Sequence, residues 1–174
     1  WFGDDAYASY RAAENVAAGN GPSWDPRLRV QAYSNPAWVL LMAAFRWLHS
    51  DIRVVSLVLS YVCSVAALIL AARSVGDIKG WGYLLGFALL TSSRSFVDFT
   101  SSGLESPLTL MIVASLCAVT WAKPGLIQRT TLVGIVSLGL VNRLDMLWLC
   151  APLLVWVGLR SNRRDLPWLA LAML

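Results

Sequence analysis

The sequence predicts an all-α protein, a polytopic bundle of transmembrane helices with two further helices in an outer loop. Of its 174 residues, 57% are hydrophobic and only 14% are charged, which is too apolar for an ordinary soluble domain. Apolar stretches recur along the chain at lengths that suit helices in a bilayer. The chain starts at Trp1 and stops inside an apolar run. We therefore expect a fragment that is truncated at both ends.

Residues 1–53 are predicted to form an extracytoplasmic loop that begins with one helix. Asp4 and Asp5 stand where a helix cap is expected, and good helix formers follow over residues 6–18. Gly19 supplies a stop signal, because glycine is common just beyond helix ends. The first helix of the loop should therefore lie directly after the acidic pair.

A second helix of this loop is predicted from Asn35, as its cap, to about residue 49. Pro36 stands at the first helical position, where proline is favoured. The spacing predicts an apolar face made by Trp38, Leu41, Phe45 and Leu48. About 14 residues are too few to span a bilayer with ease, so an interfacial or re-entrant helix is expected.

Residues 54–174 are predicted to hold about five membrane spans and the start of a sixth. The apolar stretches cover residues 54–72, 81–91, 108–122, 132–141, 146–159 and 166–174. Several are shorter than the roughly 20 residues of a regular span. Short or broken helices of this kind are tolerated where they surround a cavity.

The charged residues between these stretches predict the orientation. One set of loops has a net charge of +5, from Arg73, Lys79, Lys123, Arg129, Arg160, Arg163 and Arg164 with only Asp77 and Asp165 as acids. The other set holds seven bases and eight acids. The positive-inside rule places the first set in the cytoplasm. A multi-pass plasma-membrane protein is expected, with its acidic face toward the periplasm or the cell exterior.

No cofactor and no nucleic-acid partner is expected. The three cysteines, Cys63, Cys117 and Cys150, lie inside apolar stretches without the spacing of a metal site or a disulfide framework. They are interpreted as packing residues. A divalent cation at the Asp4 and Asp5 pair stays open, because carboxylates are the ligands that such ions prefer.

The pair Asp4 and Asp5 is the sharpest candidate for catalysis. One carboxylate can cap the helix, but the second has no such duty, and adjacent acids raise each other's proton affinity. The alternative is a cap beside a solvated acid. Tyr7, Arg11 and Glu14 share one face of the next helix by spacing. Arg11 either pairs with Glu14 or is free to bind a phosphate group.

A polar stretch over residues 91–107 lies between two apolar spans. Arg94 and Asp98 are four residues apart and form either a mutual ion pair or part of a substrate site. Glu105 either completes a capping box with Ser102 or is available to a substrate.

Arg143 and Asp145 lie between two spans with almost no loop. Charged side chains at a membrane boundary are expensive unless they are paired or face water. The sequence leaves two interpretations, a pair in a cavity that opens to the outer side or a snorkelling pair.

Three motifs taken in order resemble polytopic GT-C glycosyltransferases, most closely the terminal arabinofuranosyltransferase (AftB type) of mycobacteria and corynebacteria. They are Asp-Asp-Ala-Tyr-Ala-Ser-Tyr-Arg from residue 4, Trp-Asp-Pro from residue 24 with Ser-Asn-Pro-Ala-Trp from residue 34, and Thr-Ser-Ser-Gly-Leu-Glu from residue 100. The resemblance covers about the first 145 residues. Arg143-Leu-Asp145 is similar to the family's Arg-Pro-Asp or Arg-Pro-Glu tip but lacks the proline.

The resemblance implies transfer of arabinofuranose from decaprenylphosphoryl arabinose to the ends of arabinan chains at the outer membrane face. The lipid bilayer, a polyprenyl phosphate sugar and an arabinan acceptor would then be the partners. The family places an essential acid in the first outer loop, which implies that Asp4 and Asp5 are catalytic. By their chemistry, the candidate substrate-binding residues are Tyr7, Arg11, Arg94, Glu105, Arg143 and Asp145.

Two rival functions stay open at this level. One is a GT-C transferase that uses another polyprenyl phosphate sugar such as mannose. The other is a non-catalytic membrane protein, either a transporter or a component of flagellar motor control.

Overall fold

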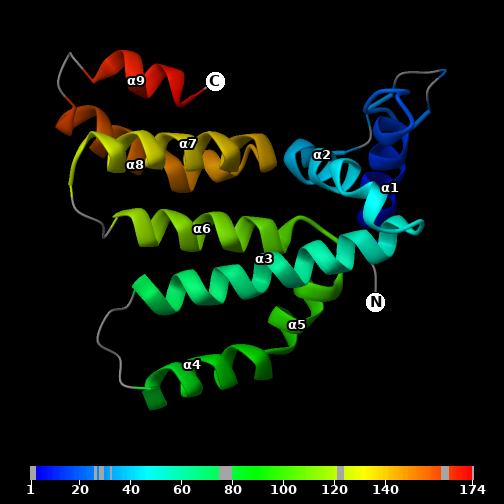
Figure 1. Ribbon diagram of the computed structural model, residues 1–174, viewed down its shortest axis with the longest axis horizontal. Coiled ribbons are helices and arrows are strands. Elements are labelled where there is room, and N and C mark those ends of the chain that lie inside the picture. Colours follow the sequence, from blue (N-terminus) through cyan, green and yellow to red (C-terminus); the bar gives the residue numbers. More distant parts are fainter. Residues whose placement is uncertain are drawn as a thin grey trace.

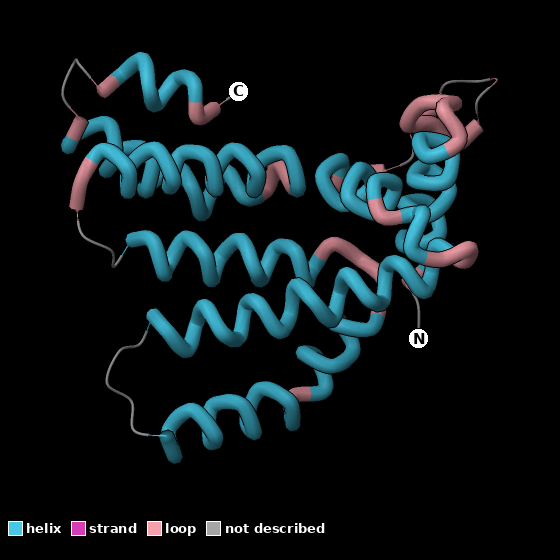
Figure 2. The backbone as a smooth tube through the Cα atoms, in the orientation of Figure 1, coloured by secondary structure: helices cyan, strands magenta, loops and turns pink. Residues whose placement is uncertain are grey.

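The computed structural model describes residues 3–25, 27, 30–31, 33–74, 80–120, 124–161 and 165–173. Every regular element in these residues is a helix (Figure 2), which confirms the all-α prediction. Four long helices run side by side in Figure 1: α3 (Ile52–Ser74), α6 (Ser106–Thr120), α7 (Leu126–Asn142) and α8 (Met146–Arg160). At one end of this group, α1 (Asp4–Ala17) and α2 (Pro36–Ala44) pack against each other.

The helix α1 begins two positions earlier than its sequence pattern predicts. Gly3 occupies the cap position, and Asp4 and Asp5 belong to the first turn. There the two carboxylates face the positive end of the helix dipole, which stabilises them. Ala6, Tyr10 and Ala13 form part of the buried face of α1. Both acids remain exposed.

The second loop helix is shorter than predicted, and its apolar face was assigned partly wrongly. The helix α2 ends at Ala44 and is followed by the short 3₁₀ helix η1 (Arg46–Leu48). Its buried residues are Trp38, Val39 and Met42, because α2 packs between α1 and α7. Leu48 lies beyond the end of α2 and is 47% exposed.

Among the described residues, α3 is the one helix that is long and apolar enough to cross a membrane alone. The helices α5 (Arg94–Ser101) and α6 meet that test only together, and they are bent by 113° at the break between them. The helices α7 and α8 are apolar but shorter. Five spans, the GT-C fold and the domain division at residue 53 therefore remain predictions.

Other predicted boundaries differ in detail. The helix α7 begins at Leu126 rather than at residue 132, and the last described helix is α9 (Leu166–Leu171). The polar stretch after α4 (Gly80–Ser92) contains the unpredicted helix α5, which Ser93 caps by accepting a hydrogen bond from the Phe96 amide. Five residues used for the charge rule lie outside the described residues: Asp77, Lys79, Lys123, Arg163 and Arg164.

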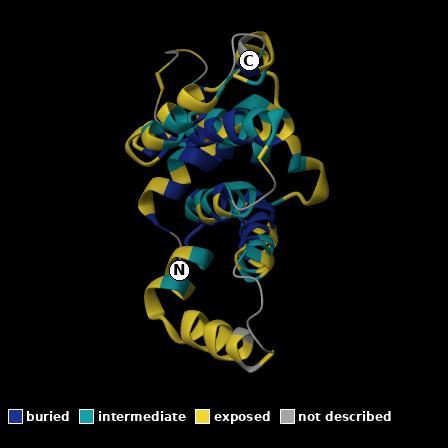
Figure 3. Cartoon of the chain, turned by 90° about the vertical axis from the view of Figure 1, so that its left-hand side faces the viewer, coloured by how far each residue is buried: buried dark blue, intermediate teal, exposed yellow. Residues whose placement is uncertain are grey.

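The helix α4 presents an apolar surface. All of its described side chains are exposed, Leu84, Leu85 and Phe87 among them. It is the lowest, mostly yellow helix in Figure 3. An apolar surface of this extent is typical of contact with lipid or with other protein.

The turn over residues 102–105 is held firmly between α5 and α6. Gly103 adopts a left-handed conformation with φ of +78°, which glycine tolerates without strain. Its carbonyl accepts hydrogen bonds from Trp38 Nε1 at 3.1 Å and from Ser56 Oγ at 3.2 Å. The Gly3 amide donates to the Ser102 carbonyl at 3.1 Å. Contacts from α1, α2 and α3 thus position the turn that carries Glu105.

The variant Trp38→Ala should lower the free energy of unfolding by about 3–5 kcal/mol. Trp38 is completely buried, and the substitution also removes the hydrogen bond to Gly103. Trp47→Ala is the matched control, because Trp47 is 77% exposed. Thermal unfolding in detergent would measure both variants. Equal losses in the two would contradict the packing described for α2.

Candidate functional site

A cavity of about 440 Å³ lies where α1, α2, the 102–105 turn and the α7–α8 turn meet. Asp5 and Ser9 of α1 line it, together with Asn35, Glu105 and Arg143. We refer to it as the central cavity. It brings together acidic, basic and amide side chains from four separate segments.

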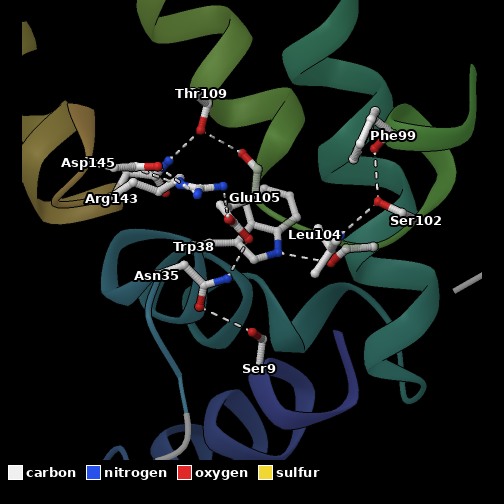
Figure 4. Close-up of polar contacts among 12 residues, drawn as sticks. Ser9, Asn35, Trp38, Phe99, Ser102, Leu104, Glu105, Thr109, Arg143 and Asp145 are labelled. Atoms are coloured by element: carbon white, nitrogen blue, oxygen red, sulfur yellow. Dashed lines mark hydrogen bonds and ion pairs between the residues drawn. The ribbon is translucent and has the colours of Figure 1, made fainter. Parts of the chain in front are cut away.

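Glu105 is buried beside this cavity, with only 8% of its side chain exposed. One carboxylate oxygen, Oε1, accepts a hydrogen bond from Arg143 Nη1 at 3.0 Å. The other, Oε2, accepts one from Asn35 Nδ2 at 2.7 Å (Figure 4). A buried charge is tolerated when it is paired and hydrogen-bonded in this way.

Arg143 connects Glu105 to Asp145. Its Nε donates to Asp145 Oδ1 at 3.0 Å and its Nη2 to Asp145 Oδ2 at 2.7 Å, which is a bidentate pair. The hydrogen bond from Arg143 lowers the pKa of Asp145, and the same contact raises the pKa of Arg143. The pair therefore persists from neutral pH into mild acid and is lost only as the pH falls through the lowered pKa of Asp145.

A second set of hydrogen bonds holds the end of α7 against the start of α6. Asn142 is fully buried, and its Nδ2 donates to Thr109 Oγ1 at 2.9 Å. Thr109 Oγ1 in turn donates to the backbone carbonyl of Glu105 at 3.2 Å. Arg143 follows Asn142 directly in the chain. These contacts place the guanidinium beside the Glu105 carboxylate.

The structure separates the members of the predicted α1 site. Asp5 lines the central cavity, whereas Asp4, Tyr7 and Arg11 do not. Tyr7 lies about 200° around the helix from Asp5, because each residue turns an α-helix by about 100°. Arg11 stacks over the Trp24 ring at 5.8 Å and donates to the Trp24 carbonyl. Tyr7 and Arg11 thus lie on the face of α1 away from Glu105.

Arg94 and Asp98 form the mutual ion pair that their spacing allowed. Arg94 Nε lies 3.6 Å from Asp98 Oδ2, and the Arg94 side chain is 95% exposed. Neither residue lines the central cavity. Exposed pairs of this kind contribute little to stability.

The capping box predicted as an alternative for Glu105 is wrong. Ser102 Oγ accepts a hydrogen bond from the Leu104 amide, and the Glu105 carboxylate is engaged by Asn35 and Arg143. The tight turn at Gly103 directs Glu105 into the interior instead.

Asn35 is the site residue whose side-chain role the sequence did not reveal. It occupies the cap position of α2 as predicted, but its side chain makes no capping hydrogen bond. Its Oδ1 accepts a hydrogen bond from Ser9 Oγ at 3.1 Å, and its Nδ2 donates to Glu105. In the sequence, helix capping is enough to explain an asparagine before Pro36. The contacts of Asn35 with distant residues therefore could not be predicted from it.

Two further cavities adjoin the central one, and Arg143 lines all three. The α5–α6 groove, of about 410 Å³, has a largely apolar wall that includes Phe96, Phe99 and Leu110. The outer cavity, of about 670 Å³, lies against the α7–α8 turn and includes Gln31 and Asp145. Arg143 therefore lies where the polar central cavity meets two cavities with largely apolar walls.

A metal ion finds no obvious site in the described part of the chain. No three His, Cys, Asp or Glu side chains there converge closely enough to hold one.

Two proteins of known name are similar to the chain in sequence. The chain is 29% identical over 136 residues to the terminal beta-(1->2)-arabinofuranosyltransferase of Mycobacterium tuberculosis, covering 71% of the chain and 22% of that protein. It is 30% identical over 143 residues to the protein of the same name from Corynebacterium glutamicum, covering 72% and 19%. The chain is a homologue of these arabinofuranosyltransferases. The resemblance predicted from three motifs is thereby confirmed.

The homology to the terminal arabinofuranosyltransferases is partial in extent. The chain spans about a fifth of the length of these relatives. No protein-family model matches the chain, and no solved structure matches it.

Proposed function

We propose that the central cavity is the catalytic site of a polyprenyl-phosphate-dependent arabinofuranosyltransferase at the outer face of the plasma membrane. The donor would be decaprenylphosphoryl arabinose, and the acceptor would be the end of a cell-wall arabinan chain. The observation that supports this most is an exposed carboxylate, Asp5, on the same cavity as the buried Glu105 and its partly exposed partner Arg143. Homology to two named terminal arabinofuranosyltransferases supports the choice of sugar.

Asp5 is the proposed catalytic carboxylate. Its carboxylate is exposed at the start of α1 and lines the cavity, so it can reach an entering hydroxyl group. It would take the proton from the acceptor hydroxyl or stabilise the positive charge that develops on the sugar. Asp4, its neighbour, would tune the local charge from outside the cavity.

Arg143 is the proposed phosphate ligand. A guanidinium keeps its charge at any physiological pH and matches phosphate oxygens in a bidentate manner. Its side chain is 42% exposed, and so is accessible to a ligand. Asp145 is 60% exposed, whereas Glu105 is buried. A phosphate would therefore displace Asp145 while Glu105 keeps holding the arginine.

The lipid part of the donor fits the α5–α6 groove. Phe96, Phe99 and Leu110 give this groove apolar walls, and it reaches Arg143 at one end. Binding of an isoprenoid chain to such a surface is favourable, because it removes apolar area from water. The phosphate would then lie at Arg143 and the sugar in the central cavity.

A transfer assay tests this function. Membranes that contain the full-length protein are incubated with labelled decaprenylphosphoryl arabinose and an arabinan acceptor. Acceptor-dependent incorporation of label is expected. Incorporation only from a mannosyl donor would point to another sugar, and none from either donor would point to a non-catalytic membrane protein.

A further inference from the structure

Asn35 is buried, with 3% of its surface exposed, and both ends of its side-chain amide are engaged. Ser9 Oγ donates to Oδ1, which requires Nδ2 to point the other way, toward Glu105. Figure 4 shows these residues in a row from α1 through Asn35 to the Glu105 carboxylate and Arg143. The orientation of the amide is therefore determined by partners on both sides.

The ionised form of Glu105 matches this arrangement. A carboxylate only accepts hydrogen bonds, and Asn35 Nδ2 and Arg143 Nη1 each donate one to a different oxygen. Loss of the Asn35 donor would leave Oε2 buried without this partner, which is costly for a charged group. The hydrogen bond from Arg143 Nη1 would then hold only Oε1, so the carboxylate could rotate about this contact and shift the guanidinium.

We infer that Asn35 is a positioning residue for sugar transfer. Its amide holds the Glu105 carboxylate toward Arg143, so that the guanidinium stands at the junction of the three cavities. Asn35 acts through Glu105 and Arg143 rather than on the substrate. The inference rests on the proposed function of the central cavity.

The charges around Asn35 predict what an acid at this position would do. Asp5 of α1 and Tyr33 line the same cavity as Asn35. Glu105 Oε2 lies 2.7 Å from Asn35 Nδ2. Arg143 comes from the α7–α8 turn and already pairs with both Glu105 and Asp145. A further carboxyl group would face Glu105 directly, and two carboxylates this close share a proton.

The substitution Asn35→Asp tests this. In acid, the new carboxyl group keeps a proton and donates to Glu105 as the amide did. In alkali, the two carboxylates are both negative and repel each other, so Glu105 no longer holds the Arg143 guanidinium in place. Between about pH 8 and about pH 5.5, the transfer rate of Asn35→Asp relative to wild type should rise about tenfold or more. The relative rate of Asn35→Ala, which carries no proton, should stay low and flat.

Asn15→Asp is the matched control. Asn15 lies on α1 and, like Asn35, donates through its side-chain amide, here to the Ser23 carbonyl at 2.7 Å, but it does not line the central cavity. Its relative rate should not change with pH. An Asn35→Asp profile that follows Asn35→Ala at every pH, or full activity of Asn35→Ala, would overturn the inference.

Thermal unfolding gives a readout that does not depend on transfer. The loss of melting temperature in Asn35→Asp should shrink from about pH 8 to about pH 5.5, whereas that in Asn35→Ala should not. A loss of melting temperature in Asn35→Asp that does not change with pH would show that the new carboxyl group shares no proton with Glu105. If wild type transfers no arabinose while this thermal signature is present, the proposed function fails and the hydrogen-bonded network stands.

Discussion

Replacing Asp5 with asparagine should lower the rate of arabinose transfer by about 10²- to 10⁴-fold, which is the range for loss of a general acid or base. Asparagine is nearly the same size but cannot accept the proton of the acceptor hydroxyl. Asp5 is exposed on the central cavity, so its loss should change the chemical step rather than the fold. Initial rates with labelled donor in membranes of matched protein content would measure the effect.

Asp4→Asn is the matched control for this change. Asp4 and Asp5 both belong to the first turn of α1 and are both exposed, so each variant removes one charge from the same helix end. The stability cost should therefore be similar, about 0.3–1 kcal/mol. Only Asp5 lines the cavity. A larger rate loss in Asp4→Asn than in Asp5→Asn would contradict this assignment.

Replacing Arg143 with methionine should reduce transfer by about 10²- to 10³-fold, the range seen when a group that stabilises transition-state charge is removed. The variant should also lose about 1–3 kcal/mol of stability, because Glu105 remains buried without its cation. The transfer rate of Arg143→Lys should lie between those of the wild type and Arg143→Met, since a single ammonium group cannot reproduce the guanidinium fork. Steady-state kinetics and thermal unfolding of the same preparations would separate the effects.

Two further variants separate the chemical role of Arg143 from its structural role. Arg94→Met removes an arginine that is 95% exposed and outside the cavity, and it should retain near-normal transfer. The double variant Arg143→Met with Glu105→Gln removes both charges of this ion pair. It should regain stability but not activity. Recovery of transfer in the double variant would show that Arg143 serves only to balance Glu105.

The transmembrane-length helix α3 was predicted closely, because a run of apolar residues over 54–72 is itself the physical cause of that helix. The sequence also predicts the loop helices, since proline at a helix start and glycine beyond a helix end act over only a few residues. The buried face of α2 is predicted only in part, at Trp38. Local spacing cannot tell which side a short, almost wholly apolar helix turns to its neighbours, and here α1 and α7 select Trp38, Val39 and Met42.

The helix α5 was missed for a related reason. Serine and threonine compete for backbone hydrogen bonds and favour turns, so a stretch rich in them reads as a loop. In the structure, Thr100 Oγ1 and Ser101 Oγ instead donate to carbonyls one turn earlier in the same helix. The hydroxyl groups thus find hydrogen-bond acceptors within α5 and do not interrupt the helix.

The sequence by itself determined that this protein is helical and apolar, and that it resembles terminal arabinofuranosyltransferases. These properties depend on composition and on contacts within a few residues. Only the tertiary structure decided that Asp5 faces the cavity and that Arg11 and Arg94 do not. The contacts that build the site join Ser9 to Asn35, Asn35 to Glu105 and Glu105 to Arg143, across 26, 70 and 38 positions. Hydrogen bonds over such separations arise from helix packing, and no local pattern specifies them.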